Sequence, residues 1–251
     1  MTQHQHAFAA EDPNQMTRVA RHVLSVLASK DDCRVIPAAQ QDEWGEVLDR
    51  LLQTSLNANP MVFEDAIKAV QSKGFEAPQI AFDMIPVIAR QLGNAWEDDV
   101  ITFADVTLGC ARLQRAVHQL TDDVPERLSA GAECSNCLVI LPDGAQHTLG
   151  AIILAKQLRL AGMDVTLDLA ATPDALVRYG ETQSFDSVLL SASLSETSDS
   201  LRALVVAARR EWPDSKVILG GSFQDHAPSY VLGTGVDYVT QDWQEALELC
   251  I

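Results

Sequence analysis

Apolar residues in the first half of the chain recur three or four positions apart, which is the spacing of one face of an α-helix. Within residues 41–56, for example, Val47, Leu48, Leu51 and Leu52 fall on the same face. This period continues to about residue 123 and predicts helices joined by short connections, which is typical of a helical bundle. The predicted helices cover residues 41–56, 61–73, 78–97 and 102–121.

Residues at the ends of these segments agree with helix boundaries. Gly74 follows the second segment and is expected to end that helix. Thr102, with Asp105 three residues later, predicts an N-terminal cap for the fourth helix. Upstream of the bundle, residues 1–15 are polar and are expected to form a flexible arm, and residues 16–40 to form a short helix and a linker.

The period changes after residue 124, where short apolar runs alternate with helical patterns. The alternation repeats five times, which predicts a doubly wound, parallel, five-stranded Rossmann-like (flavodoxin-like) sheet over residues 134–251. The expected fold class is therefore α plus α/β, with a four-helix bundle over residues 41–124 ahead of the sheet domain. The predicted strands are residues 137–142, 163–169, 186–191, 216–219 and 236–239, and the predicted helices are residues 148–161, 173–183, 197–211 and 242–250.

Composition excludes several classes of protein. The chain has 35 acidic and 18 basic residues and a net charge of -17, which disfavours a protein that binds DNA through its own phosphate contacts. No apolar run approaches the roughly 20 residues of a membrane helix, and the N-terminus lacks the features of a signal peptide. Five cysteines, an odd and sparse set, indicate reduced thiols and a cytoplasmic protein.

Unusual residues gather at the carboxyl ends of three predicted strands, the edge at which such sheets bind ligands. Each group has an ordinary explanation by itself: a helix cap, a satisfied loop backbone or a tight turn. Their order and spacing together indicate a binding site. The groups are Gln146, His147, Thr148, Leu149 and Gly150 after the first strand, Ser191 and Ser193 at the end of the third, and Gly220 and Gly221 after the fourth.

This order resembles the cobalamin-binding domain family, whose motif is Asp-x-His-x-x-Gly, then Ser-x-Leu some 40 residues on, then Gly-Gly. The resemblance implies that His147 is the lower axial ligand of cobalt, in place of the cofactor's own dimethylbenzimidazole. It also implies that Ser191 lies near the benzimidazole of the displaced nucleotide tail. Gly150, Gly220 and Gly221 would leave room for that tail. Neutral imidazole is a suitable ligand for a transition metal.

The helical half carries a second resemblance. The segment from Leu92 to Trp96 (LGNAW), followed by Ile101 and Thr102, is similar to the helical cap that precedes many cobalamin domains. The resemblance implies that Trp96 lies over the upper face of the corrin ring. A core tryptophan at the end of the bundle is the alternative interpretation.

The sequence departs from the family pattern at three places. Ala145 replaces the aspartate two positions before the histidine, which argues against a corrinoid carrier for methyl transfer, and Asp143 is out of register. Ser193 replaces the leucine of Ser-x-Leu. Val106 and Thr107 stand where light-sensing repressors that use adenosylcobalamin have Glu-His, so the expected upper ligand is water, hydroxide or a loosely held alkyl group.

The loop from Pro142 to Gly150 is most similar to antirepressors of photosynthesis genes of the AerR/PpaA type, and to the heme or cobalamin domain of the AppA type. The resemblance implies a non-enzymatic sensor that binds cobalamin in the hydroxo or aquo form and responds to light or redox state. Its expected partner is a DNA-binding repressor of the CrtJ/PpsR type, with no direct nucleic acid and no membrane contact. The acidic charge agrees with action through a protein partner.

Three other interpretations remain open: a heme sensor with His147 as axial ligand, a corrinoid carrier in methyl transfer, and a protein-binding scaffold without cofactor. Cys134 and Cys137 form a lone Cys-x-x-Cys with no partners for a zinc set. The dinucleotide, Walker and α/β-hydrolase motifs are absent.

Overall fold

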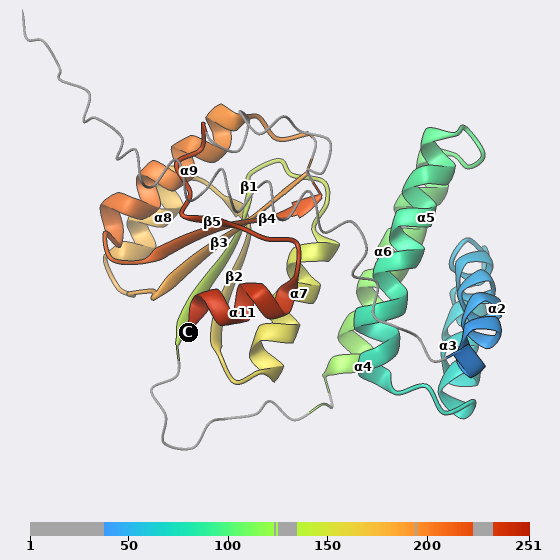
Figure 1. Ribbon diagram of the computed structural model, residues 1–251. Coiled ribbons are helices and arrows are strands. Elements are labelled where there is room, and N and C mark those ends of the chain that lie inside the picture. Colours follow the sequence, from blue (N-terminus) through green and yellow to red (C-terminus); the bar gives the residue numbers. More distant parts are fainter. Residues whose placement is uncertain (1–37, 123, 125–134, 194, 223–232) are drawn as a thin grey trace, which may run out of the picture. The chain divides into compact units, whose positions relative to one another are not determined.

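The computed structural model describes residues 38–122, 124, 135–193, 195–222 and 233–251 (Figure 1). The predicted arm and nearly all of the predicted helix and linker ahead of the bundle lie outside the described residues. The chain divides into two compact units. The helical unit contains the described residues between 32 and 134 together with residues 146–167, and the sheet unit contains residues 135–145 and 168–251.

The helical unit contains the four helices that the hydrophobic period predicts. Helix α3 begins with Pro60 behind the cap Asn59, and Gly74 lies beyond its end with φ of 96°. Helix α6 begins with the predicted capping box, in which Thr102 and Asp105 bond each other's backbone N–H. The elements are α2 (Ala38–Ser55), α3 (Pro60–Ser72), α4 (Ala77–Gln79), η1 (Ile80–Met84), α5 (Ile85–Glu97) and α6 (Phe103–Thr121), with α7 (Leu149–Leu160) in the same unit.

The third predicted helix has a π-helical turn that the sequence pattern did not predict. Elements α4, η1 and α5 follow one another without a break over residues 77–97, and within η1 the N–H of Ile85 bonds to the carbonyl of Ile80. Pro86 comes next and has no N–H to donate to the preceding turn. The π-helical turn, which is wider than an α-helical one, lets the helix continue without the hydrogen bond that Pro86 cannot donate.

Close packing of α5 on α6 fixes the core of the helical unit. A Cβ at Gly109 would lie 2.7 Å from Cδ1 of Leu92, so any larger residue here would require the buried Leu92 side chain to shift. Arg112 is buried and donates from Nη1 to the carbonyl of Ser55 over 2.6 Å. The largest fully buried side chains of this unit are Leu51, Ile80, Met84, Ile85, Ile88, Leu92, Leu113 and, on α7, Leu158.

The sheet domain has the predicted fold class. Its five strands lie in the order β2-β1-β3-β4-β5, the doubly wound arrangement, and the β1–β3, β3–β4 and β4–β5 pairs are parallel. The strands are β1 (Asn136–Pro142), β2 (Asp164–Ala171), β3 (Ser187–Ser193), β4 (Lys216–Ser222) and β5 (Tyr238–Val239), and the helices of the sheet unit are α8 (Pro173–Gly180), α9 (Ser198–Glu211) and α11 (Trp243–Cys250).

Alternate strand residues build the core of the sheet unit. Leu138, Val188 and Val217 occupy equivalent positions on neighbouring strands and belong to one buried cluster with Leu176 of α8 and Leu204 of α9. Helices α8 and α9 therefore cover the same face of the sheet. No helix in the described part of the chain is long and apolar enough to span a membrane.

Candidate functional site

The His147 segment links β1 to α7. A tight turn opens it: Gly144 has φ of 82°, and the N–H of Ala145 bonds to the carbonyl of Pro142 over 3.1 Å. The His147 side chain that follows is exposed, and no residue that the structure describes forms a hydrogen bond or ion pair with it. An imidazole held this way is free to ligate a metal through either ring nitrogen.

Thr148 is held by a contact from the helical bundle. It occupies the N-cap position of α7, but its hydroxyl makes no capping bond to that helix. The hydroxyl instead accepts a hydrogen bond from Nε2 of Gln114 on α6, over 2.7 Å. Sequence reasoning missed Gln114, because a single polar residue beside an apolar stripe carries no motif. Gln114 thus fixes the residue next to His147.

Gly150 lies in the first turn of α7 and is exposed. A Cβ at this position would have no protein atom within 4 Å. Packing within the chain therefore does not require glycine here. This agrees with a glycine retained to keep space for a ligand.

The structure corrects the placement of the two glycines after the fourth strand. Gly220 and Gly221 lie within β4, where they pair with Ser191 and Ala192 of β3. Gly221 has φ of 114°, and a Cβ there would lie 2.0 Å from the carbonyl oxygen of Ala192. At Gly220 the nearest atom to a Cβ would be the carbonyl oxygen of Thr240, at 3.2 Å. Strand pairing by itself therefore requires glycine at position 221, independently of any ligand.

The two predicted serines of β3 differ in their surroundings. Ser191 is half-buried beside Gly220, and no hydrogen bond reaches its hydroxyl from the described residues. The hydroxyl of Ser193 is buried and shares a hydrogen bond of 2.9 Å with the hydroxyl of Ser195. Ser191 is therefore the serine whose hydroxyl is available to a ligand.

Glu196 anchors the loop after β3 and was not predicted from the sequence. Its carboxylate accepts hydrogen bonds from the backbone N–H of Ser193 and from the hydroxyl of Ser195. Partial burial acts to raise the pKa of Glu196, but these hydrogen bonds outweigh it and hold the pKa below its usual value. Glu196 directly follows Ser195 and comes three positions after Ser193, and a glutamate this close to two serines at a strand end is the signal that could have identified it.

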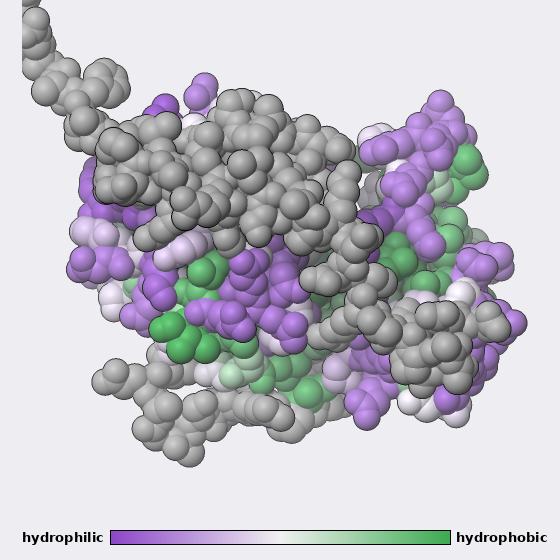
Figure 2. Space-filling view, viewed as in Figure 1, coloured by the Kyte–Doolittle hydropathy of each residue, from purple (hydrophilic) through white to green (hydrophobic). Residues whose placement is uncertain are grey.

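Trp96 lies at the end of α5 in an exposed apolar area. Its side chain is 43% exposed, and its ring lies 6.0 Å from that of Phe103, centroid to centroid. Val100 and Phe103 are more exposed still. Figure 2 shows this apolar area at the upper right, among hydrophilic residues where α5 meets α6. Trp96 is therefore a surface tryptophan and not a core residue of the bundle, which leaves it open to a ligand.

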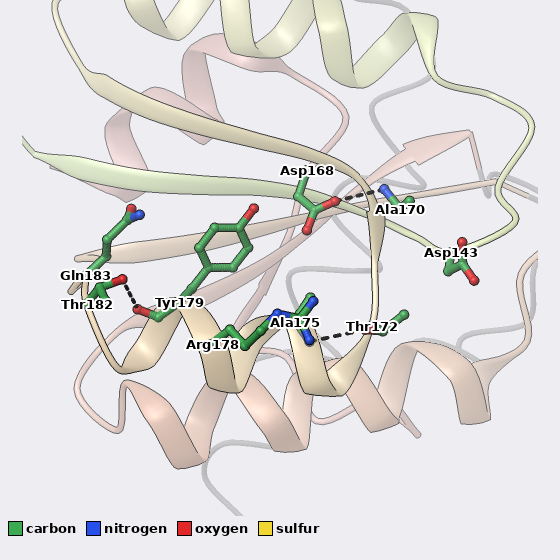
Figure 3. Close-up of a pocket in the computed structure, with 9 residues that line it drawn as sticks. All are labelled: Asp143, Asp168, Ala170, Thr172, Ala175, Arg178, Tyr179, Thr182 and Gln183. Atoms are coloured by element: carbon green, nitrogen blue, oxygen red, sulfur yellow. Dashed lines mark hydrogen bonds between the residues drawn. The ribbon is translucent and has the colours of Figure 1, made fainter.

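A pocket of about 570 Å³ lies elsewhere in the sheet unit, beside β2 and α8 (Figure 3). Asp143, the aspartate that is out of register with the family motif, is one of the residues that line this pocket. The pKa of Tyr179, another lining residue, is raised above its usual value. Partial burial is the largest cause, followed by the negative charge of Asp168 and a hydrogen bond between Tyr179 and Asp168. The positive charge of Arg178 opposes this shift with a smaller effect. None of the residues predicted to hold the cofactor lines this pocket.

The structure brings Ser191 and Gly220 side by side in the sheet unit. His147 and Trp96 belong to the helical unit, together with Gln146, Thr148, Leu149 and Gly150. Contact of these residues with one cofactor stays a prediction. Among the described residues, no group of three His, Cys, Asp or Glu side chains could hold a metal ion.

Comparison with known proteins gives the family. The family model for the B12 binding domain matches residues 136–250. A relative from Rhodobacter capsulatus, described as an uncharacterized 20.5 kDa protein in the bchF-crtJ intergenic region, is 34% identical over 165 residues, which are 65% of this chain and 86% of the relative. The Methanosarcina barkeri monomethylamine corrinoid protein shares the fold, with a TM-score of 0.63 and 15% identity over 84% of this chain and 97% of that one. The chain described here belongs to the B12-binding domain family.

Proposed function

We propose that the chain binds cobalamin and acts in the cytoplasm as a light- or redox-responsive antirepressor, through a DNA-binding repressor of the CrtJ/PpsR type. The observation that carries the proposal is His147, an exposed imidazole with no partner among the described residues, in a chain that belongs to the B12-binding domain family. Cobalamin supplies a light-absorbing cobalt centre whose axial ligands can change on illumination. In this role the protein catalyses no reaction and is not an enzyme.

The donor set of the chain fits a metal that arrives inside a macrocycle. A corrin ring already supplies the equatorial ligands of cobalt, so the protein needs to contribute one axial ligand. His147 is such a ligand, because its side chain is exposed and no described residue competes for its ring nitrogens. The open space at Gly150 and the available hydroxyl of Ser191 are suited to a bulky nucleotide tail.

The contact between Gln114 and Thr148 is the means by which α6 would respond to the cofactor. Thr148 is the immediate neighbour of His147, and α6 follows directly after the segment that carries Trp96. A change of ligation at His147 is therefore transmitted to α6 through one hydrogen bond. A ligand shifts such an equilibrium only as far as its affinities for the two arrangements differ.

Two observations favour the antirepressor over a carrier of methyl groups. The relative from Rhodobacter capsulatus is named for its location in the bchF-crtJ intergenic region, next to crtJ. The proposed partner is a repressor of the CrtJ type. Ala145 leaves the histidine loop without the aspartate that would tune proton uptake at a methyl-transfer site. The net charge of -17 also favours action through a protein and not through DNA.

The experiment is a binding assay with a purified CrtJ/PpsR-type repressor on its operator DNA. The chain loaded with hydroxocobalamin is added in the dark and under illumination, beside the chain without cofactor. We expect the loaded chain to bind the repressor and release the DNA, with an effect that changes under illumination or on reduction. Repressor binding that is the same with and without cofactor, or none in any state, would refute the proposed sensor.

A further inference from the structure

The pocket of about 570 Å³ beside β2 and α8 is built entirely from residues of the sheet unit (Figure 3). Asp168 and Ala170 alternate along β2, so their side chains point to the same side of that strand. Arg178 and Tyr179 follow Ala175 by one turn of α8 and share its face of the helix. The volume is within the range of pockets that hold small molecules, which is roughly 300–1,000 Å³.

The walls of this pocket are held in place from behind. The ring of Tyr179 packs edge-on against Phe185, with 6.4 Å between the ring centroids, and Phe185 packs in turn against Trp212 at 5.0 Å. Nε1 of Trp212 donates a hydrogen bond to the carbonyl of Gln183 over 3.0 Å. Phe185 and Trp212 belong to the buried core of the sheet unit. Tyr179 and Gln183, which both line the pocket, therefore rest on a close-packed base.

The two carboxylates of the pocket come from neighbouring strands. Asp143 directly follows β1, and its backbone N–H bonds to the carbonyl of Ala171 at the end of β2 over 3.0 Å. Oδ1 of Asp168, within β2, accepts a hydrogen bond from the N–H of Ala170 over 2.9 Å (Figure 3). Backbone contacts of the sheet thus hold both residues beside the cavity, as a binding site requires.

Opposite charges share this pocket without neutralising each other. The side chains of Asp143 and Arg178 both line it, and neither forms a hydrogen bond or an ion pair with any residue that the structure describes. Together with Asp168, the lining offers two carboxylates and one guanidinium. Ala170 and Ala175 are too small to fill the space between these groups. The complementary ligand carries two cationic groups and one anionic group.

We propose that this pocket binds a basic amino acid of the lysine class, which has one carboxylate and two ammonium groups. The ligand's carboxylate meets Arg178, because a planar guanidinium matches the geometry of a carboxylate. Its two ammonium groups meet Asp143 and Asp168, and the ring of Tyr179 offers an apolar surface to the methylene chain. The site is separate from the proposed cofactor site, since no residue predicted for the cofactor lines it.

The first test is isothermal titration calorimetry of the full chain without cofactor, at low ionic strength. Four probes are compared: L-lysine, cadaverine (lysine without its carboxylate), 6-aminohexanoate (lysine without its α-ammonium group) and L-glutamate. We expect L-lysine to bind with a dissociation constant of about 1 mM or below, and each other probe to bind at least about fivefold more weakly. No binding of L-lysine up to about 10 mM, or an equal affinity for cadaverine, would overturn the proposal.

The second test assigns the charges. Arg178→Gln should weaken the binding of L-lysine by about tenfold and leave that of cadaverine undiminished, because only L-lysine loses a partner for its carboxylate. Asp143→Asn should weaken the binding of both probes. The matched controls are Arg90→Gln on α5 and Asp174→Asn at the start of α8, two exposed positions outside the pocket. Both controls should bind L-lysine as wild type does.

Two results of this comparison would overturn the proposal. Equal losses in Asp174→Asn and Asp143→Asn would mean that L-lysine is attracted only by the general negative charge of the chain, whose net charge is -17. Undiminished binding of L-lysine to Arg178→Gln would mean that its carboxylate does not lie at α8. Because the titrations use the chain without cofactor, either failure is distinguishable from a failure to bind cobalamin.

Discussion

Gln114 donates a hydrogen bond from Nε2 to the hydroxyl of Thr148 over 2.7 Å, and so joins α6 to the residue beside His147. The hydroxyl of an N-cap threonine ordinarily caps its own helix, whereas this one serves a neighbouring helix. The position of the proposed cobalt ligand is thus tied to the bundle that carries Trp96.

Removal of this bond tests the link. Gln114→Ala is expected to lower the free energy of unfolding by about 1 kcal/mol, because it leaves the Thr148 hydroxyl without its donor. If the bond also holds the His147 loop for cobalamin, the dissociation constant should rise by about fivefold. Urea unfolding and equilibrium titration with hydroxocobalamin measure the two effects. Gln119→Ala, at an exposed position on the same helix, is the control. Equal affinities of the two variants for hydroxocobalamin would show that the Gln114–Thr148 bond does not hold the His147 loop for the cofactor.

Gly150→Ala should separate stability from cofactor binding. The new Cβ meets no protein atom within 4 Å, and alanine suits a helix better than glycine, so we expect about 0.5 kcal/mol of added stability. If the open space receives the nucleotide tail, the same change weakens cobalamin binding. Gly45→Ala in α2, which is equally open, should leave cobalamin binding unchanged. If Gly150→Ala binds cobalamin as tightly as wild type does, the nucleotide tail does not lie at this position.

Gly221→Ala is expected to destabilise the sheet unit by about 3 kcal/mol or more, with or without cofactor. The cause is a φ of 114° and a Cβ only 2.0 Å from the carbonyl oxygen of Ala192. Gly220→Ala, with its closest approach of 3.2 Å, should cost about 1 kcal/mol. Urea unfolding of the chain without cofactor compares the two. Equal losses would mean that β4 shifts to accept the new side chain.

The loop after β3 should weaken in acid because of Glu196. Hydrogen bonds hold the folded-state pKa of Glu196 below the ordinary 4.5, so its stabilising contribution is present above pH 4.5 and is lost as the pH falls through the lowered folded pKa. Glu196→Gln should cost about 1 kcal/mol at pH 7, after allowance for solvent screening, and almost nothing near pH 3. Thermal unfolding at both pH values measures the difference. A gap that stays constant across this range would exclude the carboxylate as its source.

The fold was predictable from the sequence because each element has its own signal. Helical period, the cap at Thr102 and the stop at Gly74 gave the bundle, and the five alternations of strand and helix gave the sheet. The π-helical turn was missed because its cause, Pro86, acts on the preceding turn and leaves the apolar spacing intact. Strands β3 and β4 extend further than predicted because Gly221 continues the ladder in a conformation that propensity treats as a turn.

The candidate site was predictable only as far as its motif. His147, Gly150 and Ser191 are motif positions, whereas Gln114 and Glu196 act through contacts that sequence spacing does not reveal. Tertiary contacts of this kind leave no local pattern.

The central claim is tested most directly by absorption spectroscopy of the purified chain with hydroxocobalamin and, separately, with heme. Wild type is compared with His147→Ala and with His118→Ala, which removes another exposed histidine. We predict that wild type and His118→Ala retain cobalamin through desalting with a shifted spectrum, and that His147→Ala does not. Equal retention and an identical spectrum in His147→Ala, or a Soret band retained in place of cobalamin, would contradict the account.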